Sequence, residues 1–335
     1  MLVETSAAPP PLAPWGLRAA SALLVVGGLD PDARLWQVVD DEGRTWAVKS
    51  SRRDVRFGAL LALDLARGGD LGVAAPLPTL QGDAWHRDGD RLVTVTAWVD
   101  GDDAAEDGLD PEGWRLLGAT VRAVHEHRVP VGAHAPRRGI KRVGRRALVR
   151  LRDLDQRLRP GGDEAERVPE LASRWHEHRR RLAALHDLGR ELKATRTPTA
   201  RVPCHGDPHL GNVVVDRTGR PWLVDLDEAT VAPREVDLVL VELGVLPHLP
   251  ITDDDLARFH EGYGPTRLDE ARLLRFGSVR ALEDVTATAD AVAGAHSPTE
   301  AHDALAALDD LLGPKGLVAL VEGRVARARP GGHRP

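Results

Sequence analysis

The sequence contains a single cysteine, Cys204, among its 335 residues. One cysteine excludes an internal disulfide, and such scarcity is typical of proteins from a reducing cytoplasm. No apolar run approaches the roughly eighteen residues that a membrane-spanning helix needs, and residues 1–16 lack the basic start of a secretory signal. We therefore expect a cytoplasmic protein that does not enter a membrane.

Lysine is scarce as well. It occurs at only four positions, 49, 141, 193 and 315, although lysine and arginine together total 45 residues. The net charge of −6 supplies no general basic field for nucleic acid. The arginine-rich segment 137–196 is explained better by solvated helix faces than by a nucleic-acid surface. We expect no nucleic-acid partner, and we treat each lysine as a candidate functional residue.

The first third of the chain has the pattern of a small sheet. Residues 33–49 alternate around an Asp-Glu-Gly-Arg turn and predict a β-hairpin, and residues 86–99 predict a second turn and strand. A helix is expected between them, at about 55–67. Residues 1–15 and 327–335 are rich in turn-forming or small residues and predict disordered tails.

Beyond Asp100 the pattern becomes mainly helical, apart from one hairpin over 213–225. The change of pattern predicts an α+β fold with an N-terminal lobe over 16–99 and a helical C-terminal lobe over 100–326. The helices are expected at 112–128, 140–159, 166–194, 266–290 and 300–311.

The stretch "PCHGDPHLGN" at 203–212 precedes that hairpin and contains Asn212, the only asparagine of the chain. If the hairpin turn centres on Thr218 and Gly219, residues whose numbers sum to 437 face each other, and Asn212 faces Asp225. Cross-strand neighbours lie about 5 Å apart at Cβ. We therefore expect an amide oxygen and a carboxylate to converge at the open end of the hairpin.

Amide and carboxylate oxygens are hard ligands that suit Mg²⁺, so Asn212 and Asp225 form a candidate magnesium site. Asp207, five residues before Asn212, is a candidate base beside the metal. Each acid has a simpler interpretation as a turn or cap residue. His205 fits a structural role under the loop better than a general base, and His209 fits loop packing and pocket lining equally well.

The pattern "HGDPHLGN", followed thirteen residues after its asparagine by the aspartate of "LVDLDEA", resembles the aminoglycoside phosphotransferase and choline kinase-like family. The resemblance implies a bilobal protein-kinase-like fold, in which a small antiparallel sheet forms the N-terminal lobe and the C-terminal lobe is larger and mainly helical. It implies that Asp207 is catalytic, that Asn212 and Asp225 bind Mg²⁺, and that Asp227 and Glu228 lie near them. Asp237 in "PREVDLVLVE" would support the catalytic loop.

The resemblance also assigns the nucleotide site. "WAVK" at 46–49 resembles the strand that carries the family's phosphate-binding lysine, so Lys49 would hold the α- and β-phosphates of ATP, or of GTP. Ala47, on the same strand face, would pack against the base. The hinge that binds the base would be Thr96, Ala97, Trp98 and Val99.

Two features depart from the family pattern. Gly27 and Gly28 match the expected glycine-rich loop weakly, and the helix after Lys49 has no glutamate to pair with it. Asp54 and Asp64 are candidate substitutes, and the alternative is that this ion pair is absent.

The function implied is transfer of the ATP γ-phosphoryl group to a hydroxyl of a small molecule. A run of acids, including Asp253, Asp254 and Asp255, favours a cationic or glycosylated antibiotic as acceptor. The alternative acceptor is a small metabolite such as an amino alcohol or sugar. The basic helices at 137–196 would instead suit a neutral or anionic acceptor. The histidines and aspartates of this region could also form a binuclear metallohydrolase site, but such an enzyme would leave "WAVK" unexplained. The D-x-D at 225–227 is also found in glycosyltransferases, but it is too short a pattern to indicate one. A non-catalytic pseudokinase would not need the four residues Lys49, Asp207, Asn212 and Asp225.

Overall fold

The structure is a computed structural model that describes residues 2–3, 8–25, 33–69, 71–130, 134, 140–192, 197–244 and 251–328. Gly27 and Gly28 and most of the predicted C-terminal tail lie outside these residues. The contacts divide the chain into two units. The first comprises the described residues within 1–137, 201–234 and 254–265, and the second comprises those within 138–200, 235–253 and 266–335.

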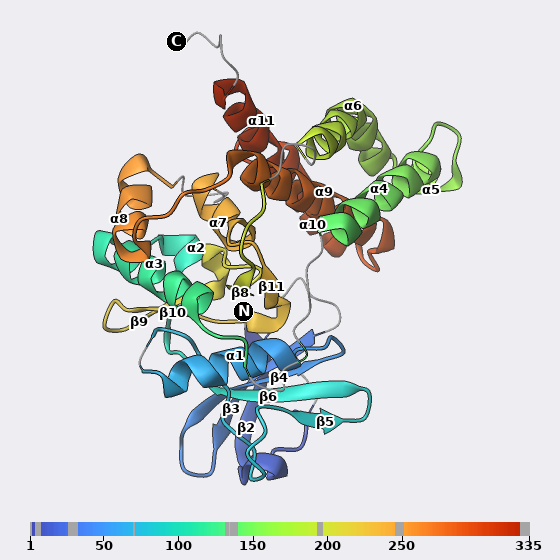
Figure 1. The fold of residues 1–335 in the computed structure, drawn as a ribbon. Helices are drawn as coiled ribbons and strands as arrows, with labels where there is room; N and C mark the ends of the chain where they lie inside the picture. Colours follow the sequence, from blue (N-terminus) through green and yellow to red (C-terminus); the bar gives the residue numbers. More distant parts are fainter. Residues whose placement is uncertain are drawn as a thin grey trace. The chain divides into compact units, whose positions relative to one another are not determined.

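A six-stranded antiparallel sheet forms the start of the first unit, in the order β1-β2-β3-β4-β6-β5 (Figure 1). Its strands are β1 (Leu2–Val3), β2 (Ala19–Val25), β3 (Ala33–Asp40), β4 (Thr45–Ser51), β5 (His86–Asp88) and β6 (Arg91–Ala97). The helix α1 (Arg56–Arg67) lies along the sheet, and the predicted hairpin and helix are confirmed.

The short helix η1 (Ala13–Trp15) corrects one expectation about the N-terminal tail. Leu12 and Trp15 are buried in the sheet's core with Trp36 and Val48, and the Trp15 indole N–H donates to the Leu77 carbonyl at 2.9 Å. A buried indole ring removes a large apolar area from water, which a disordered segment would not do. Residues 12–15 therefore belong to the folded unit.

The rest of the first unit consists of helices and short strands around the segment 201–234. They are β7 (Gly101–Asp103), α2 (Ala104–Asp107), α3 (Pro111–Glu126), β8 (Val202–Cys204), η2 (Leu210–Asn212), β9 (Val213–Asp216), β10 (Pro221–Leu223), η3 (Leu226–Glu228), β11 (Thr230–Ala232) and α8 (Asp253–Tyr263). The sheets here pair in the orders β10-β9-β7 and β11-β8. The segment that carries the candidate catalytic loop therefore groups with the N-terminal sheet.

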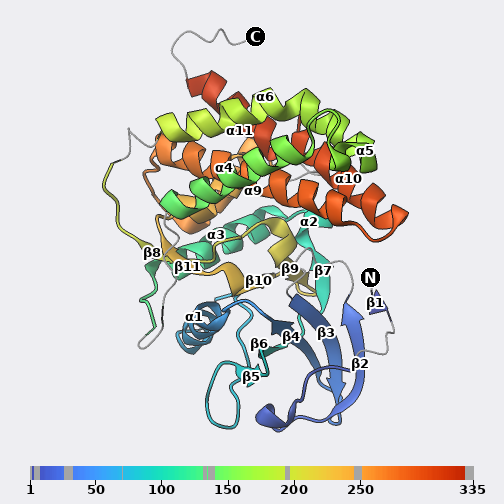
Figure 2. The same cartoon turned by 90° about the vertical axis from the view of Figure 1, so that its right-hand side faces the viewer.

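The described residues of the second unit contain helices and no strands, and α9 lies at its centre. Its helices are α4 (Ile140–Arg157), α5 (Asp163–Arg167), α6 (Pro169–Glu191), α7 (Glu235–Glu242), α9 (Glu270–Gly294), α10 (Pro298–Leu312) and α11 (Leu317–Ala328). α9 contacts α4, α6, α7, α10 and α11 (Figure 2), and Trp175, Leu182 and Leu273 are buried in the common core. The α+β fold with a small sheet and a larger helical part is confirmed. The predicted lobe limits at 99 and 326 stay a prediction.

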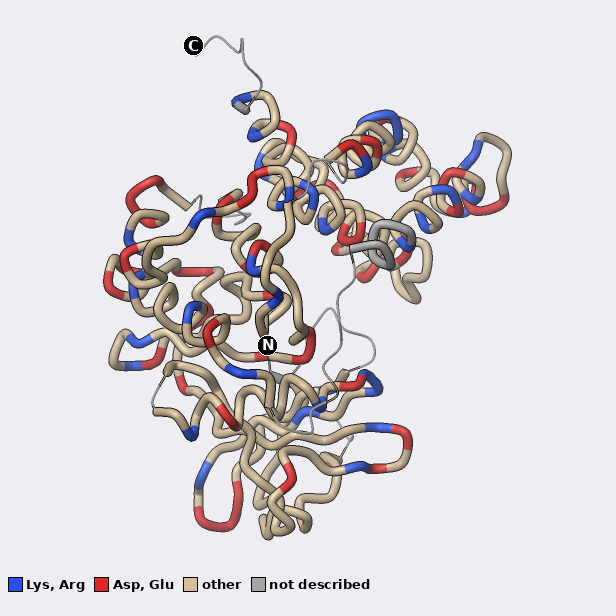
Figure 3. Tube along the Cα trace, in the orientation of Figure 1, with Lys and Arg blue, Asp and Glu red and all other residues tan. Residues whose placement is uncertain are grey.

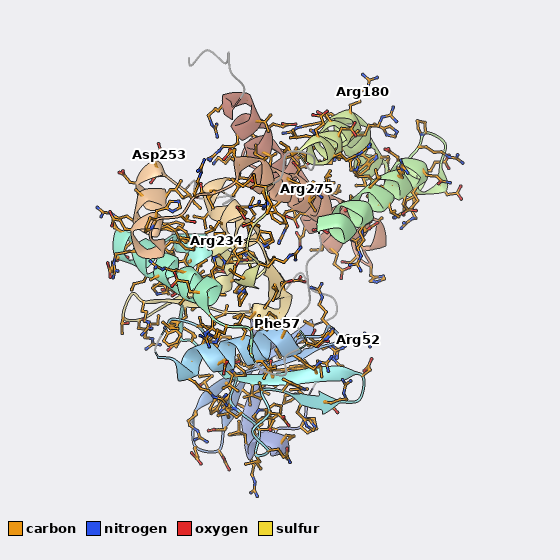
Figure 4. The ribbon with its side chains drawn as sticks, in the orientation of Figure 1. Arg52, Phe57, Arg180, Arg234, Asp253 and Arg275 are labelled. Atoms are coloured by element: carbon orange, nitrogen blue, oxygen red, sulfur yellow. The ribbon has the colours of Figure 1, made fainter. Side chains whose placement is uncertain are left out.

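The arginine-rich faces of this helical unit are largely paired with acids. Arg174 pairs with Asp309 at 2.6 Å and Arg181 with Glu322 at 2.8 Å, whereas Arg180 is exposed and points away from α6 (Figure 4). Along α6, acidic positions are interspersed with the basic ones, and Figure 3 shows both signs of charge over the helical unit. This distribution supports the interpretation of solvated helix faces. Among the described residues, no helix is both long and apolar enough to cross a membrane.

Two hairpins of the first unit are built by the same short sequence pattern, Asp-x-x-Gly-Arg-x-Trp, at 40–46 and 216–222. In the first, Gly43 has a φ of 79° and its N–H donates to the Asp40 carbonyl at 3.0 Å. The Asp40 carboxylate accepts the N–H groups of Glu42 and Arg44 and the Trp46 indole N–H, at 2.8–3.0 Å.

The second hairpin repeats these contacts. Gly219 has a φ of 83°, and Asp216 accepts from the N–H groups of Thr218 and Arg220 and from the Trp222 indole at 2.8–3.1 Å. The guanidinium of Arg220 lies 4.7 Å from the centre of the Trp222 ring, as that of Arg44 lies over Trp46. Each aspartate thus fixes a three-residue loop that ends in a left-handed glycine.

This loop corrects the predicted register of the second hairpin. Val213 pairs with Leu223 and Val215 with Pro221, so facing residues sum to 436 and not to 437. The loop has three residues, 217–219, and an odd loop shifts the pairing by one. Asn212 therefore lies opposite Val224, whose N–H donates to the Asn212 carbonyl at 2.9 Å, and Asp225 follows one residue later.

The turn aspartates predict an acid-sensitive stability. The pKa of Asp216 is lowered to about 2 by hydrogen bonds from Thr218 and Trp222, and that of Asp40 is also about 2, because bonds from Trp46 and Arg44 outweigh the opposing effect of burial. A carboxylate with a depressed folded pKa stabilises the fold above its unfolded pKa, near 4, and loses this effect as the pH falls towards 2. Asp216→Asn should lower the melting temperature at pH 7 and flatten its decline between pH 4 and 2.

Thermal unfolding followed by circular dichroism across that pH window measures the effect. Asp102→Asn, which removes an exposed carboxylate of β7, is the matched control and should keep the wild-type decline. An Asp216→Asn variant whose melting temperature falls with acid as steeply as that of the wild type would show that this turn carboxylate does not contribute.

Candidate active site

The loop 205–212 is held from below by His205, which is fully buried. The His205 Nδ1 accepts the Asp207 N–H at 3.2 Å, and its Nε2–H donates to the Val224 carbonyl at 2.9 Å. Both ring nitrogens are therefore engaged with the backbone, and the ring is neutral with its proton on Nε2. The predicted structural role of His205 agrees with these contacts, which tie the loop to the residue before Asp225.

Asp207 is half-buried at the turn of this loop. Its carbonyl accepts the side-chain N–H of Asn212 at 2.8 Å, and its carboxylate lies 3.8 Å from the Nε2 of His209. The His209 ring also packs on Gly211, where a Cβ would lie 2.9 Å from it. Asn212 thereby fixes the loop through its amide nitrogen and keeps its amide oxygen for another ligand.

Asp225 has an unusual backbone. It is the only non-glycine residue with a positive φ among those described, at φ 60° and ψ 66°. Its carboxylate accepts the Asp227 N–H at 3.4 Å as the N-cap of η3. Backbone strain of this kind clusters at functional sites, where the surrounding structure holds a side chain in a required direction.

Lys49 reaches this turn from the central strand β4. Its Nζ lies 2.7 Å from the Asp225 carboxylate and 2.8 Å from that of Asp227, and about one fifth of its side chain is exposed, at 20%. Burial alone acts to lower the pKa of Lys49, but the carboxylates of Asp227 and Asp225 outweigh it, and the pKa is raised. The lysine is therefore a permanent cation at neutral pH.

The strand register places the rest of the predicted nucleotide site. Ala47 pairs with Thr96 across β4 and β6, two residues from the pair of Lys49 with Thr94. Ala97 ends β6, and the Trp98 N–H donates to the Thr45 carbonyl at 3.0 Å. Val99 follows, half-buried, so the predicted hinge 96–99 continues directly from the strand beside Lys49.

Two glycines allow the turn 225–228 to be packed from both sides. A Cβ on Gly58 of α1 would lie 1.9 Å from the Leu226 carbonyl oxygen, and one on Gly206, which has a φ of 93°, would lie 2.1 Å from that of Glu228. Phe57, the residue before Gly58 in α1, is labelled in Figure 4. Arg53, just before α1, adds an ion pair with Glu228. The helix and the candidate catalytic loop thus fix the turn that carries Asp225 and Asp227.

The structure excludes both candidate acids that were expected to substitute for the helix glutamate. Asp54 pairs with Arg56 at 2.6 Å, and Asp64 lies 3.5 Å from Arg67 and 3.4 Å from His127. Neither contacts Lys49. The role of Asp227 as its partner was missed by sequence reasoning, although the D-x-D spacing at 225–227 signalled a second carboxylate. Asp237 is buried in α7, and its predicted support of the loop stays a prediction.

The donors present fit a magnesium ion. Asn212 offers an amide oxygen whose partner nitrogen is already bonded, and Asp225 offers a carboxylate that is 38% exposed. These are hard oxygens in the number that Mg²⁺ takes from a protein when nucleotide phosphates supply further ligands. With the corrected register they come from opposite sides of the open end of the β9–β10 hairpin.

Comparison with protein families gives one match that spans most of the chain: the profile of the phosphotransferase enzyme family matches residues 27–274. No curated protein sequence matches the chain.

Among solved structures, a spectinomycin phosphotransferase crystallised with ADP and spectinomycin is 19% identical, with a TM-score of 0.81 over 94% of this chain and 96% of that one. A microcompartment-associated aminopropanol kinase is 18% identical, with a TM-score of 0.62 over 94% and 96% of the two chains. An aminoglycoside phosphotransferase from Alicyclobacillus acidocaldarius is also 18% identical, with a TM-score of 0.59 over 96% and 97%. At such identities these likenesses establish the fold.

The close packing of α1 on the turn predicts that Gly58 cannot be enlarged. Gly58→Ala should lower the melting temperature by several degrees, because the new methyl group overlaps a backbone carbonyl, and overpacking typically costs about 1–3 kcal/mol. Gly294→Ala is the control, since a Cβ at that helix position meets no atom within 4 Å. A Gly58→Ala variant as stable as Gly294→Ala would contradict the packing of α1 on Leu226.

Proposed function

The chain belongs to the phosphotransferase enzyme family, and from this premise we propose that it transfers the γ-phosphoryl group of ATP to a hydroxyl group of a small molecule. The observation that carries the proposal is the gathering of the expected residues in one unit. The ion pair of Lys49 with Asp225 joins the sheet to the turn, and the hydrogen bond from Asn212 to Asp207 joins the metal-ligand candidate to the catalytic loop.

Asp207 acts on the acceptor in this proposal. Its backbone is fixed on both sides, by His205 at the N–H and by Asn212 at the carbonyl, so the point from which its carboxylate projects is held in one place. There it orients the acceptor hydroxyl and accepts its proton as the bond to phosphorus forms. His209 lies 3.8 Å from that carboxylate, and in this proposal it lines the acceptor side of the loop.

Lys49 acts on the nucleotide. A cation on the central strand, beside a hinge that continues from the neighbouring strand, is arranged to bind the α- and β-phosphates of ATP or GTP while backbone groups of 96–99 bind the base. Asn212 and Asp225 would hold the magnesium ion. When bound, Mg²⁺ neutralises negative charge on the β- and γ-phosphates. The spectinomycin phosphotransferase of the same fold was crystallised with ADP, which supports a nucleotide substrate.

For the acceptor we propose a hydroxylated antibiotic that is cationic or glycosylated. The run of acids at the start of α8, where Asp253 and Asp254 are exposed, supports a cationic compound. Other acids are already neutralised, since Asp284 pairs with Arg280 and Glu261 with Arg258. The second candidate acceptor is a small metabolite such as an amino alcohol, which the likeness to an aminopropanol kinase favours.

A panel of hydroxylated antibiotics and metabolites, each incubated with ATP and Mg²⁺, tests the function and the acceptor class together. We expect at least one compound to gain the mass of a phosphoryl group. With that compound, Asp207→Asn should reduce turnover by roughly 10²–10⁴, the usual share of a positioned base, while ADP binding stays near that of the wild type.

The outcomes of the panel separate the two acceptor classes. Phosphorylation of amino alcohols or sugars alone would overturn the antibiotic acceptor and leave the phosphotransferase intact. Near-normal turnover by Asp207→Asn would remove the assigned role of that residue.

The shared metal site predicts coupled effects of its two ligands. Asn212→Ala and Asp225→Ala should each weaken Mg²⁺-dependent ADP binding, and the double variant should lose little more than the worse single variant, because either change disrupts one cluster. Isothermal titration in the presence and absence of Mg²⁺ measures this. Losses that add fully would place the two residues in separate sites.

A further inference from the structure

The lysine that binds nucleotide phosphates needs an acidic partner that keeps its ammonium in place. In protein kinases this partner is a glutamate of the helix after the lysine strand. Here α1 contains no glutamate, and its only aspartate, Asp64, lies beside Arg67 and His127. The partners of Lys49 come instead from the turn after β10, where it meets Asp225 and Asp227.

The two partners differ in what else they must do. Asp225 is the more exposed carboxylate, at 38% against 15% for Asp227, and it is the one expected to turn to a magnesium ion. A carboxylate that binds the metal neutralises Lys49 less well, so the lysine needs a second acid that stays with it. Asp227 is the shielded member of the pair, 2.8 Å from the ammonium.

We propose that Asp227 is the positioning residue of Lys49 and takes the place of the helix glutamate. The inference rests on the proposed nucleotide site. Lys49 contacts both carboxylates, and in this proposal it keeps Asp227 when Asp225 serves the metal.

The packing of α1 explains how the helix still contributes without an acid of its own. Gly58 brings the helix backbone against Leu226, between the two aspartates, and Arg53 pairs with Glu228 on the far side of Asp227. The helix thus fixes the turn, and the turn fixes the lysine. In protein kinases an ion pair joins the lysine directly to the helix. Here the helix packs on the backbone of the turn, and the turn supplies the ion pair with Lys49.

The test compares carboxylate-to-amide changes at Asp227 and at Asp54 and Asp64, the two acids that the sequence offered for this role. Asp227→Asn should weaken Mg·ADP binding by about tenfold and raise the KM for ATP similarly, because the ammonium loses the partner that holds it. Asp54→Asn and Asp64→Asn remove the same charge from the vicinity of α1 and should stay within about twofold of the wild type. Isothermal titration gives the affinities without the need for an acceptor.

A second comparison shows whether Asp227 acts through Lys49. In a Lys49→Met background, Asp227→Asn should change ADP affinity by less than about twofold, since the residue it positions is already absent. With Lys49 present, Asp227→Glu keeps the charge and should recover most of the ADP affinity that Asp227→Asn loses.

Several results would overturn the inference. An undiminished tenfold loss in the Lys49→Met background would mean that Asp227 acts on the nucleotide or metal itself, and a loss in Asp64→Asn would return the role to the helix. An Asp227→Asn variant that fails to fold while Lys49→Met folds would show a structural role independent of the lysine. If the wild type binds no ADP, the proposed function fails; if it binds ADP and Asp227→Asn binds equally well, only the inference fails.

Discussion

The candidate site depends on one electrostatic constraint, which is that a lysine ammonium on the central strand must be held among carboxylates. Lys49 is largely shielded from water, and a cation so placed is tolerated only if opposite charge lies close to it. Asp225 and Asp227 supply that charge from a turn far away in the sequence. Lys49 is fixed on its strand and the two aspartates are fixed in their turn. Their ion pairs therefore hold the sheet that is expected to bind the nucleotide next to the loop that is expected to carry out the chemistry.

The turn is held by contacts with its backbone from several directions. His205 bridges the N–H of Asp207 and the carbonyl of Val224, and Gly58 and Gly206 let a helix and a loop approach the turn from two sides. Within this turn Asp225 has a left-handed conformation. Asp225, His205 and the two glycines therefore act together to hold the carboxylates of the turn next to the Lys49 ammonium.

Much of this could be predicted from the sequence because the informative residues are rare and local. A lone asparagine near two aspartates, and one of four lysines on an alternating strand, stand out by composition and pattern. The strands and helices followed from periodicity. The hairpin register was wrong by one residue because an even loop was assumed, whereas Asp216 and the left-handed Gly219 build a loop of three. The partner of Lys49 was missed because the contact joins residues 49 and 227, and no local pattern reports such a distant pairing.

A crystal structure with Mg·ADP would test the proposed site most directly. We expect the metal on the Asn212 amide oxygen and the Asp225 carboxylate, and the Lys49 ammonium within hydrogen-bond distance of an α- or β-phosphate oxygen while it still contacts Asp227. A nucleotide bound away from Lys49, or a metal held without Asn212 and Asp225, would contradict it.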